Sequence, residues 1–378
     1  MTAKGARGDM AFGSNPFRPS FGVSPRVLAG RAGVIDDFDI ALDEGPGSPM
    51  RTVLVSGARG MGKTVVLNEL EDRARSRGWW VLRLPEGERL VSELEQTILP
   101  SLLVEHDPEA IRRRLTGGSV GGLGSVSTET VDSFPVTQSL AMMLARLAHL
   151  AAGHGTGLLL TLDEVQAAPV GDLAALASAY QHLVRDDQEV ALAAAGLPVG
   201  IEALLEQRGT TFLRRAERIH LPALADDEVR AATVRTVQGA ERVISDEAVT
   251  RLVQIARGYP YLLQLVGYHA WRAAGEDGVI TRADVEHTLP VVVERMSRLV
   301  HAPALRAVPE GQMAYLRAMA QDDGPSSTGE IASRLGVTKG HQNMQRTRLL
   351  ERELIEPAGH GMVDFALPYL REHVQRLP

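Results

Sequence analysis

The feature that most constrains this chain is a glycine-rich segment at residues 57–64, which reads Gly-Ala-Arg-Gly-Met-Gly-Lys-Thr. An apolar run at residues 52–56 precedes it, and a stretch with helical spacing follows it. Glycines let a backbone wrap closely around phosphate oxygens, and the unpaired N–H groups at a helix start attract anions. Lys63 would reach the β- and γ-phosphates, while the Thr64 hydroxyl would ligate Mg²⁺. The sequence therefore predicts a strand, a phosphate-binding loop and a helix, in that order.

We expect the whole loop and the first turn of its helix to surround the phosphates. The candidate nucleotide-binding residues of this segment are Gly57, Ala58, Arg59, Gly60, Met61, Gly62, Lys63, Thr64 and Val65.

A second motif is an apolar run at residues 158–162 that ends in Asp163 and Glu164. At the carboxyl end of a strand, Asp163 would hold hydrated Mg²⁺, and Glu164 would polarise a water molecule for attack on the γ-phosphate. We expect Lys63, Asp163 and Glu164 to be catalytic, Thr64 and Asp163 to be the metal ligands, and ATP and Mg²⁺ to be the cofactors. The alternative is a solvated strand end with no catalytic role.

Composition narrows the class of protein further. A chain of 378 residues exceeds one ordinary domain, and 44% hydrophobic with 23% charged residues is typical of soluble globular proteins. The absence of cysteine excludes disulfides and zinc fingers with cysteine ligands. No apolar stretch reaches the 18 or so residues of a membrane span, and residues 1–20 lack the apolar core of a secretory signal. We expect a cytoplasmic protein with no membrane partner.

Apolar runs at residues 52–56, 79–84, 158–162, 190–195 and 218–221 predict five buried strands, with helices between them. That alternation predicts an α/β fold with a mainly parallel sheet covered on both faces. Beyond Leu221, four helices are expected at residues 226–238, 245–257, 262–274 and 281–289. The Gly- and Ser-rich stretch 112–130 is either a flexible loop or an inserted hairpin. The expected parts are a flexible tail (1–20), a core (21–225), a helical subdomain (226–300), a linker (301–311) and a C-terminal module (312–378).

These motifs resemble the AAA+ ATPases of the origin-recognition type and the related signal-transduction ATPases with numerous domains. The resemblance runs from about residue 21 to the C-terminus. It implies a P-loop NTPase core, a helical lid subdomain and a C-terminal winged helix-turn-helix, with ATP bound between core and lid. Segment 28–31 is similar to the family's segment beside the adenine, which implies a nucleotide role for Gly30 and Arg31; an ordinary loop role stays open. Segment 258–263 resembles the family's Gly-x-Pro sequence, which implies that Pro260 helps to close the lid, beside its role in starting a helix.

Two features of the resemblance concern hydrolysis. Relatives often carry a polar sensor residue after the fourth strand, but here the strand is followed by Gly196, Leu197 and Pro198. No side chain there can bond the γ-phosphate, so we expect slow hydrolysis. The resemblance also implies an arginine finger, for which Arg215 and Arg218 are the candidates, and with it a homo-oligomer. A solvated basic helix end is the alternative.

The C-terminal module resembles a winged helix-turn-helix whose recognition helix begins after Thr338 and runs to about Glu353. Residues 333–352 hold five basic residues and one acid, although the chain as a whole carries a net charge of −7. The module from Glu310 onward, however, has eight bases and nine acids. Contact with protein, or packing on the core, is therefore the alternative to DNA. The candidate DNA contacts are Lys339, Gln342, Asn343 and Arg346.

The sequence thus predicts an ATP-binding protein and Mg²⁺-dependent ATPase that acts as a nucleotide-controlled switch, with ATP or ADP and double-stranded DNA as partners. The alternative is a signalling or defence ATPase whose winged helix contacts a protein partner.

Overall fold

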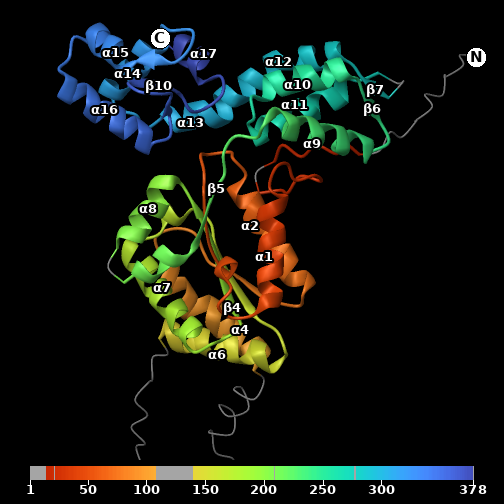
Figure 1. The fold of residues 1–378 in the computed structure, drawn as a ribbon, viewed down its shortest axis with the longest axis vertical. Coiled ribbons are helices and arrows are strands. Elements are labelled where there is room, and N and C mark those ends of the chain that lie inside the picture. The colour runs from red at the N-terminus through yellow and green to blue at the C-terminus, as the bar shows by residue number, and fades with distance from the viewer. Residues whose placement is uncertain (1–13, 21, 108–138, 208, 276–277, 378) are drawn as a thin grey trace, which may run out of the picture. The chain divides into compact units, whose positions relative to one another are not determined.

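A computed structural model describes residues 14–20, 22–107, 139–207, 209–275 and 278–377 (Figure 1). The glycine-rich stretch 112–130 lies outside these ranges. The chain divides into two compact units. The sheet unit comprises residues 32–57 and 63–221, and the helical unit comprises the described parts of 1–31, 58–62 and 222–378.

The sheet unit is built on five parallel strands in the order β2-β3-β4-β1-β5. All five predicted strands are confirmed to within a residue at each end, because each is a short apolar run between helical segments. Parallel pairing brings the carboxyl ends of β1, β3 and β4 to one edge of the sheet, where the two predicted motifs lie. The strands are β1 (Thr52–Ser56), β2 (Trp80–Arg83), β3 (Leu158–Leu162), β4 (Val190–Gly196) and β5 (Glu217–His220).

Helices cover both faces of this sheet, as the alternation of elements predicts (Figure 1). Helices α1 (Ala32–Glu44) and α2 (Lys63–Ser76) lie on one face. The opposite face carries α6 (Leu140–Gly153), α7 (Val170–Arg185) and α8 (Pro198–Glu206). Strands β3 and β4 are buried along their whole length. A right-handed crossover after each strand accounts for this arrangement. Shorter helices α3 (Leu90–Glu93) and α4 (Leu99–His106) follow β2.

The helical unit contains the four helices expected after residue 221. They are α9 (Asp226–Gln238), α10 (Asp246–Ala256), α11 (Pro260–Ala273) and α12 (Arg282–Met296), with a two-stranded parallel pair, β6 (Val243–Ile244) and β7 (Val279–Ile280). The Ser245 and Thr281 hydroxyls accept backbone N–H bonds of 3.2 and 3.3 Å, which confirms them as helix caps. Helix α12 runs past the expected end at Leu289. It passes through Pro290, which is exposed, so the missing N–H costs one solvent-side hydrogen bond without ending the helix.

The N-terminal segment corrects one prediction. Residues 14–18 are not a loose tail, because Phe17 is 2% exposed and packs on α11. The Asn15 side chain donates to the Tyr268 carbonyl at 2.9 Å, and the Arg18 N–H donates to Gln264 Oε1 at 2.9 Å. Gly267 leaves the space for the ring, since a Cβ there would lie 2.3 Å from it. Composition suggested a tail because Gly, Ser, Asn and Pro surround this one anchoring aromatic.

The predicted linker 301–311 is also different in the structure. The chain stays helical through a π-helical turn at Ser297–His301 and through α13 (Ala302–Leu305). Pro303 is the second residue of α13, directly after the π-helical turn, and does not end the helical course of the chain. Proline content therefore misled the prediction.

The C-terminal module has four helices and a small antiparallel sheet, whose first strand lies between the first two helices. The expected recognition helix is present as Lys339–Glu351, while the assignment as a winged helix stays a prediction. Strand order in the sheet is β8-β10-β9. The elements are α14 (Glu310–Met319), β8 (Ser326–Ser327), α15 (Thr328–Leu335), α16 (Lys339–Glu351), β9 (Ile355–Pro357), β10 (Met362–Phe365) and α17 (Leu370–Gln375). Within the described ranges, we find no helix whose length and hydropathy would let it cross a membrane.

Candidate nucleotide site

The phosphate loop takes a backbone course that requires glycine at two positions. It leaves β1 at Ser56 and enters α2 at Lys63. Gly60 and Gly62 have φ values of +79° and +89°, in the left-handed region that other residues rarely adopt. The Met61 N–H donates to the Ala58 carbonyl at 3.2 Å and closes a turn between them. The glycine spacing read from the sequence is therefore a backbone requirement.

Lys63 is the first residue of α2. Its side chain is buried, and its Nζ donates to the Gly57 carbonyl oxygen at 2.8 Å. A buried ammonium group needs compensating acceptors, and the loop carbonyl supplies one. Val65, the third residue of α2, is half-buried. The lysine is thus positioned by the sheet unit, beside the loop that the sequence predicts to bind phosphate.

The two predicted metal ligands meet at the carboxyl edge of the sheet. Thr64 Oγ1 donates to Asp163 Oδ2 at 2.5 Å, although the residues are 99 positions apart. Asp163 Oδ1 accepts the Glu164 N–H at 2.8 Å, which fixes the carboxylate plane. A hydroxyl oxygen and a carboxylate oxygen are the hard ligands that Mg²⁺ prefers. The two side chains therefore fit the predicted ion.

Negative charge is concentrated at this edge. Burial raises the pKa of Glu86, and the charges of Asp163 and Glu164 raise it further. A cation would relieve that repulsion. Within the described ranges no group of three or more His, Asp or Glu side chains forms a complete metal site. Mg²⁺ at Thr64 and Asp163 would therefore need phosphate oxygens and water to complete its shell, as is usual for this ion.

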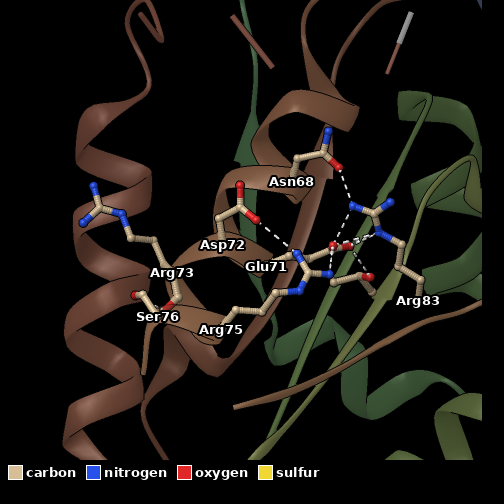
Figure 2. Close-up of polar contacts among 8 residues, drawn as sticks. Asn68, Glu71, Asp72, Arg73, Arg75, Ser76 and Arg83 are labelled. Atoms are coloured by element: carbon tan, nitrogen blue, oxygen red, sulfur yellow. Dashed lines mark hydrogen bonds and ion pairs between the residues drawn. The ribbon is translucent and has the colours of Figure 1, made fainter. Parts of the chain in front are cut away.

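Helix α2 is fixed on the sheet by Glu71, whose polar contacts Figure 2 shows. This buried carboxylate accepts hydrogen bonds from Arg83 Nε on β2 at 2.7 and 2.8 Å and from Arg75 at 2.8 Å. The Thr161 hydroxyl on β3 donates to it at 2.8 Å. Burial alone would raise the pKa of Glu71, but the bonds from Arg83, Thr161 and Arg75 together lower it. Because Thr161 lies two residues before Asp163, Glu71 joins the helix that begins with Lys63 to the strand that carries the acids.

The structure places the other predicted nucleotide residues in the helical unit. Arg31 is buried and donates to the Pro222 carbonyl oxygen at 2.6 Å; burial lowers its pKa, against the opposing charge of Glu228. Gly30 has a φ of +62°, and a Cβ there would lie 2.5 Å from the Glu228 carboxylate. This packing is compatible with the ordinary loop role, and the nucleotide role of Gly30 and Arg31 stays a prediction. Pro260 begins α11, as its helix-start role predicts.

Sequence reasoning missed Tyr259, which precedes Pro260. Its hydroxyl donates to the Arg59 carbonyl oxygen of the phosphate loop at 2.8 Å, and its side chain is buried. A Cβ on Gly60 would lie 2.1 Å from that hydroxyl. The only sequence signal was an aromatic within the Gly-x-Pro segment, which the pattern treats as variable.

The arginine-finger candidates lie at the end of the sheet unit. Arg215 closes a short 3-10 helix (Thr211–Arg215) and is exposed. Arg218 on β5 is also exposed and lies 3.8 Å from the Glu202 carboxylate, in an ion pair too long and too solvated to fix it.

The DNA-contact candidates on α16 are not all on the surface. Asn343 is exposed and Arg346 is half-buried, while the side chain of Lys339 is outside what the structure describes. Gln342 is wrong as a surface contact, because it is 6% exposed and donates to the Tyr315 hydroxyl at 3.2 Å. A polar side chain on the predicted recognition helix suggested contact with base edges. The Gln342 amide instead donates a hydrogen bond to the buried Tyr315 hydroxyl.

Two family models match parts of this chain. Residues 27–193 match the model of the AAA ATPase domain, and residues 298–374 match a domain of unknown function, DUF8462. No curated protein matches the chain.

Among solved structures, the Walker-type ATPase PABY2304 of Pyrococcus abyssi is similar in fold. It has 15% identity and a TM-score of 0.63 over 92% of this chain and 96% of its own. Cdc6p from Pyrobaculum aerophilum has 15% identity and a TM-score of 0.48, over 95% and 96% of the two chains. RuvB from Thermotoga maritima has 16% identity and a TM-score of 0.47, over 93% and 96%. The fold comparison rests on the first of these alone.

The matched segment contains the phosphate loop, the lysine that follows it and the acids at the end of β3. Residues 27–193 therefore match an AAA ATPase domain, and the chain has an α/β fold with a five-stranded parallel sheet.

Proposed function

We propose that this protein binds ATP with Mg²⁺ at Lys63, Thr64 and Asp163, hydrolyses it slowly, and uses the nucleotide as a switch. The observation that carries the proposal is the 2.5 Å bond between Thr64 and Asp163. It joins the start of α2 to the end of β3 beside a buried lysine, which is the arrangement that Mg²⁺ and phosphate together require.

The residues of the chain divide the chemistry among them. The Lys63 ammonium group stabilises charge on the phosphate oxygens, and the loop N–H groups orient the chain of phosphates. Mg²⁺, when bound through Thr64 and Asp163, would neutralise the negative charge that develops on the phosphate oxygens. Glu164 orients a water molecule and accepts its proton as the water oxygen bonds to the γ-phosphorus and the bond to the β,γ-bridging oxygen breaks. The products are ADP and phosphate.

Two substitutions separate binding from hydrolysis. Lys63→Ala should weaken ATP binding at least about tenfold, because a buried ammonium contact to phosphate is lost. Glu164→Gln should keep the affinity but lower the hydrolysis rate by about 100-fold, because an amide cannot accept the proton. Ser76→Ala, at the far end of α2, is the control. Calorimetry of Mg²⁺–ATP binding and phosphate release measure the two effects. Unchanged binding and hydrolysis in both variants would refute the site.

We also propose DNA as the partner of the C-terminal module. Among the described residues, Arg346, Arg348 and Arg352 enter no ion pair, while Arg334 of the same module bonds both Asp322 oxygens at 2.6 and 2.8 Å. Unneutralised guanidinium groups on and after α16, with exposed Asn343, suit phosphates and base edges. A signalling or defence ATPase with a protein partner is the alternative, favoured by exposed Met344 (41%) on the same helix.

A salt series distinguishes the two partners. Binding of duplex DNA should weaken steeply with salt, and Arg348→Ala should reduce the slope of log K against log salt by about one. Arg317→Ala is the matched control, because that arginine is paired with Glu310 at 2.7 Å. No DNA binding, or binding that ignores salt, would favour the protein-contact alternative.

A further inference from the structure

Strand β4 ends at Gly196, which has no side chain to offer to the candidate nucleotide site. The side chain of Gln166 lies against this end of the strand. Gln166 belongs to a short 3-10 turn, Val165–Ala167, directly after the acids of β3. Its Oε1 accepts the Leu197 N–H at 3.1 Å, at the point where β4 ends. Its Nε2 donates to Glu164 Oε2. One side chain therefore bridges the ends of two strands.

The orientation of this amide is dictated by its partners. The Leu197 N–H can only donate, so the amide oxygen must face it. The amide nitrogen is then turned to Glu164, and it can only donate. Gln166 consequently gives the carboxylate a fixed N–H bond on Oε2 and leaves Oε1 to meet a water molecule.

The surrounding chain is shaped to admit Gln166. A Cβ on Gly196, the last residue of β4, would lie 2.9 Å from Gln166 Oε1. A Cβ on Gly200, within α8, would lie 2.8 Å from Gln166 Cβ. Neither glycine has a positive φ, so the backbone does not call for glycine at either place. A glycine inside a helix destabilises that helix relative to alanine. Space for Gln166 explains both glycines.

Glu164 needs such support. Its φ of 49° lies in the left-handed region, where a non-glycine residue persists only if its surroundings hold it. Its own N–H is bonded to Asp163, which fixes the backbone but not the carboxylate.

We propose that Gln166, in the turn after β3, is the positioning residue for Glu164. This inference rests on the proposed hydrolysis for its consequence in rate. The contact itself involves only residues of the chain and is testable without nucleotide.

The first test uses Gln166→Met, which keeps the size of an exposed side chain and removes the bonds. We expect kcat to fall about tenfold with the affinity for ATP unchanged, because a misplaced base costs rate and not binding. Gly196→Ala, which crowds Oε1, should lower kcat in the same way. The control is Gln188→Met, near the opposite end of β4, where the side chain donates only to the Asp186 carbonyl at 3.2 Å.

The second test needs no nucleotide. Glu164→Ala, Gln166→Ala and the double variant form a double-mutant cycle, measured by thermal unfolding. The sum of the two single decreases in melting temperature should exceed the decrease in the double variant by about 2 °C. If the parent hydrolyses ATP and Gln166→Met leaves kcat unchanged, or if the unfolding losses add, the inference is overturned. If the parent fails to hydrolyse ATP while the cycle is non-additive, the proposed hydrolysis fails and the positioning contact stands.

Discussion

At the scale of single residues, the helical unit buries a titratable group that takes no part in the nucleotide site. His301 is 0% exposed, and its Nε2 bonds to the Pro368 carbonyl oxygen at 2.9 Å. That bond assigns the proton of the neutral ring to Nε2, and the buried Nδ1 has no partner among the described residues. Burial is the main cause that lowers the pKa of His301 to about 4; the Pro368 bond opposes it, and nearby His373 adds to it.

This pKa predicts a loss of stability in mild acid. The unfolded chain binds a proton at His301 from about pH 6.5 downward, whereas the folded chain resists it until about pH 4. The free energy of unfolding should therefore fall by up to about 3 kcal/mol as the pH is lowered from about 6.5 to about 4. Above pH 6.5, His301 should cause no such loss. Urea unfolding of His301→Gln at pH 4 to 8 should show a weaker fall than the parent, while exposed His182→Gln should behave like the parent. Parallel curves for all three would contradict the assignment.

At the same scale, the buried position of Glu71 predicts that its removal lowers the stability of the fold, and the neighbouring exposed Asp72 provides the comparison. Glu71→Ala leaves the buried Thr161 hydroxyl without its bond, but Arg75 and Arg83 are 47% and 61% exposed and can turn to water. The loss should therefore be about 2 kcal/mol, below the 3–5 typical of a fully buried pair. Asp72→Ala, whose carboxylate is 67% exposed and pairs with the same Arg75, should cost under about 0.5 kcal/mol. Equal losses in urea unfolding would count against a structural role for Glu71.

At the scale of elements, the N-terminal segment and α11 act as a pair. Gly267→Ala places a methyl group 2.3 Å from the Phe17 ring, which must then leave its site. Alanine favours the helix over glycine by about 1 kcal/mol. If Gly267→Ala nevertheless releases the N-terminal segment, the steric clash with Phe17 outweighs that gain in helix propensity. We expect chymotrypsin to cleave after Phe17 about tenfold faster, which corresponds to about 1.4 kcal/mol of opening. Gly171→Ala, in α7 with open space around it, should leave cleavage unchanged. Unaltered cleavage in Gly267→Ala would refute the anchor.

The elements also show what the sequence can and cannot predict. The strands and the capped helices were readable because hydrophobic period and capping hydroxyls act locally. The strand order β2-β3-β4-β1-β5 places Asp163 beside Thr64, and the loop motif and the acids made that meeting predictable. Gln166 and Tyr259 were missed because each is held in place by a bond to a backbone group that is distant in the sequence, at Leu197 and Arg59 respectively. Phe17 was missed for the same reason, since its site is a glycine on a helix about 250 residues away.

At the scale of the whole molecule, the arginine-finger hypothesis implies that the rate of hydrolysis depends on oligomerisation. If Arg215 or Arg218 completes a neighbour's site, hydrolysis per molecule should rise with protein concentration. Arg215→Ala or Arg218→Ala should abolish that rise, while Arg185→Ala, exposed on α7, should keep it. Mass measurement in solution with an ATP analogue and with ADP gives the oligomeric state directly. A monomer whose activity per molecule is independent of concentration would exclude the finger.

The docked N-terminal segment has a consequence for biosynthesis. Asn15 bonds to Tyr268, 253 residues later, whereas Thr64 and Asp163 are only 99 residues apart. At about 5–20 residues per second, a ribosome needs roughly 13 to 50 s to make the partner of Asn15. The sheet unit can form during that interval, and Phe17 has no site until α11 emerges. The Phe17 side chain of the nascent chain must therefore stay exposed to water through most of translation. The first part of the helical unit to be synthesised is consequently among the last to fold.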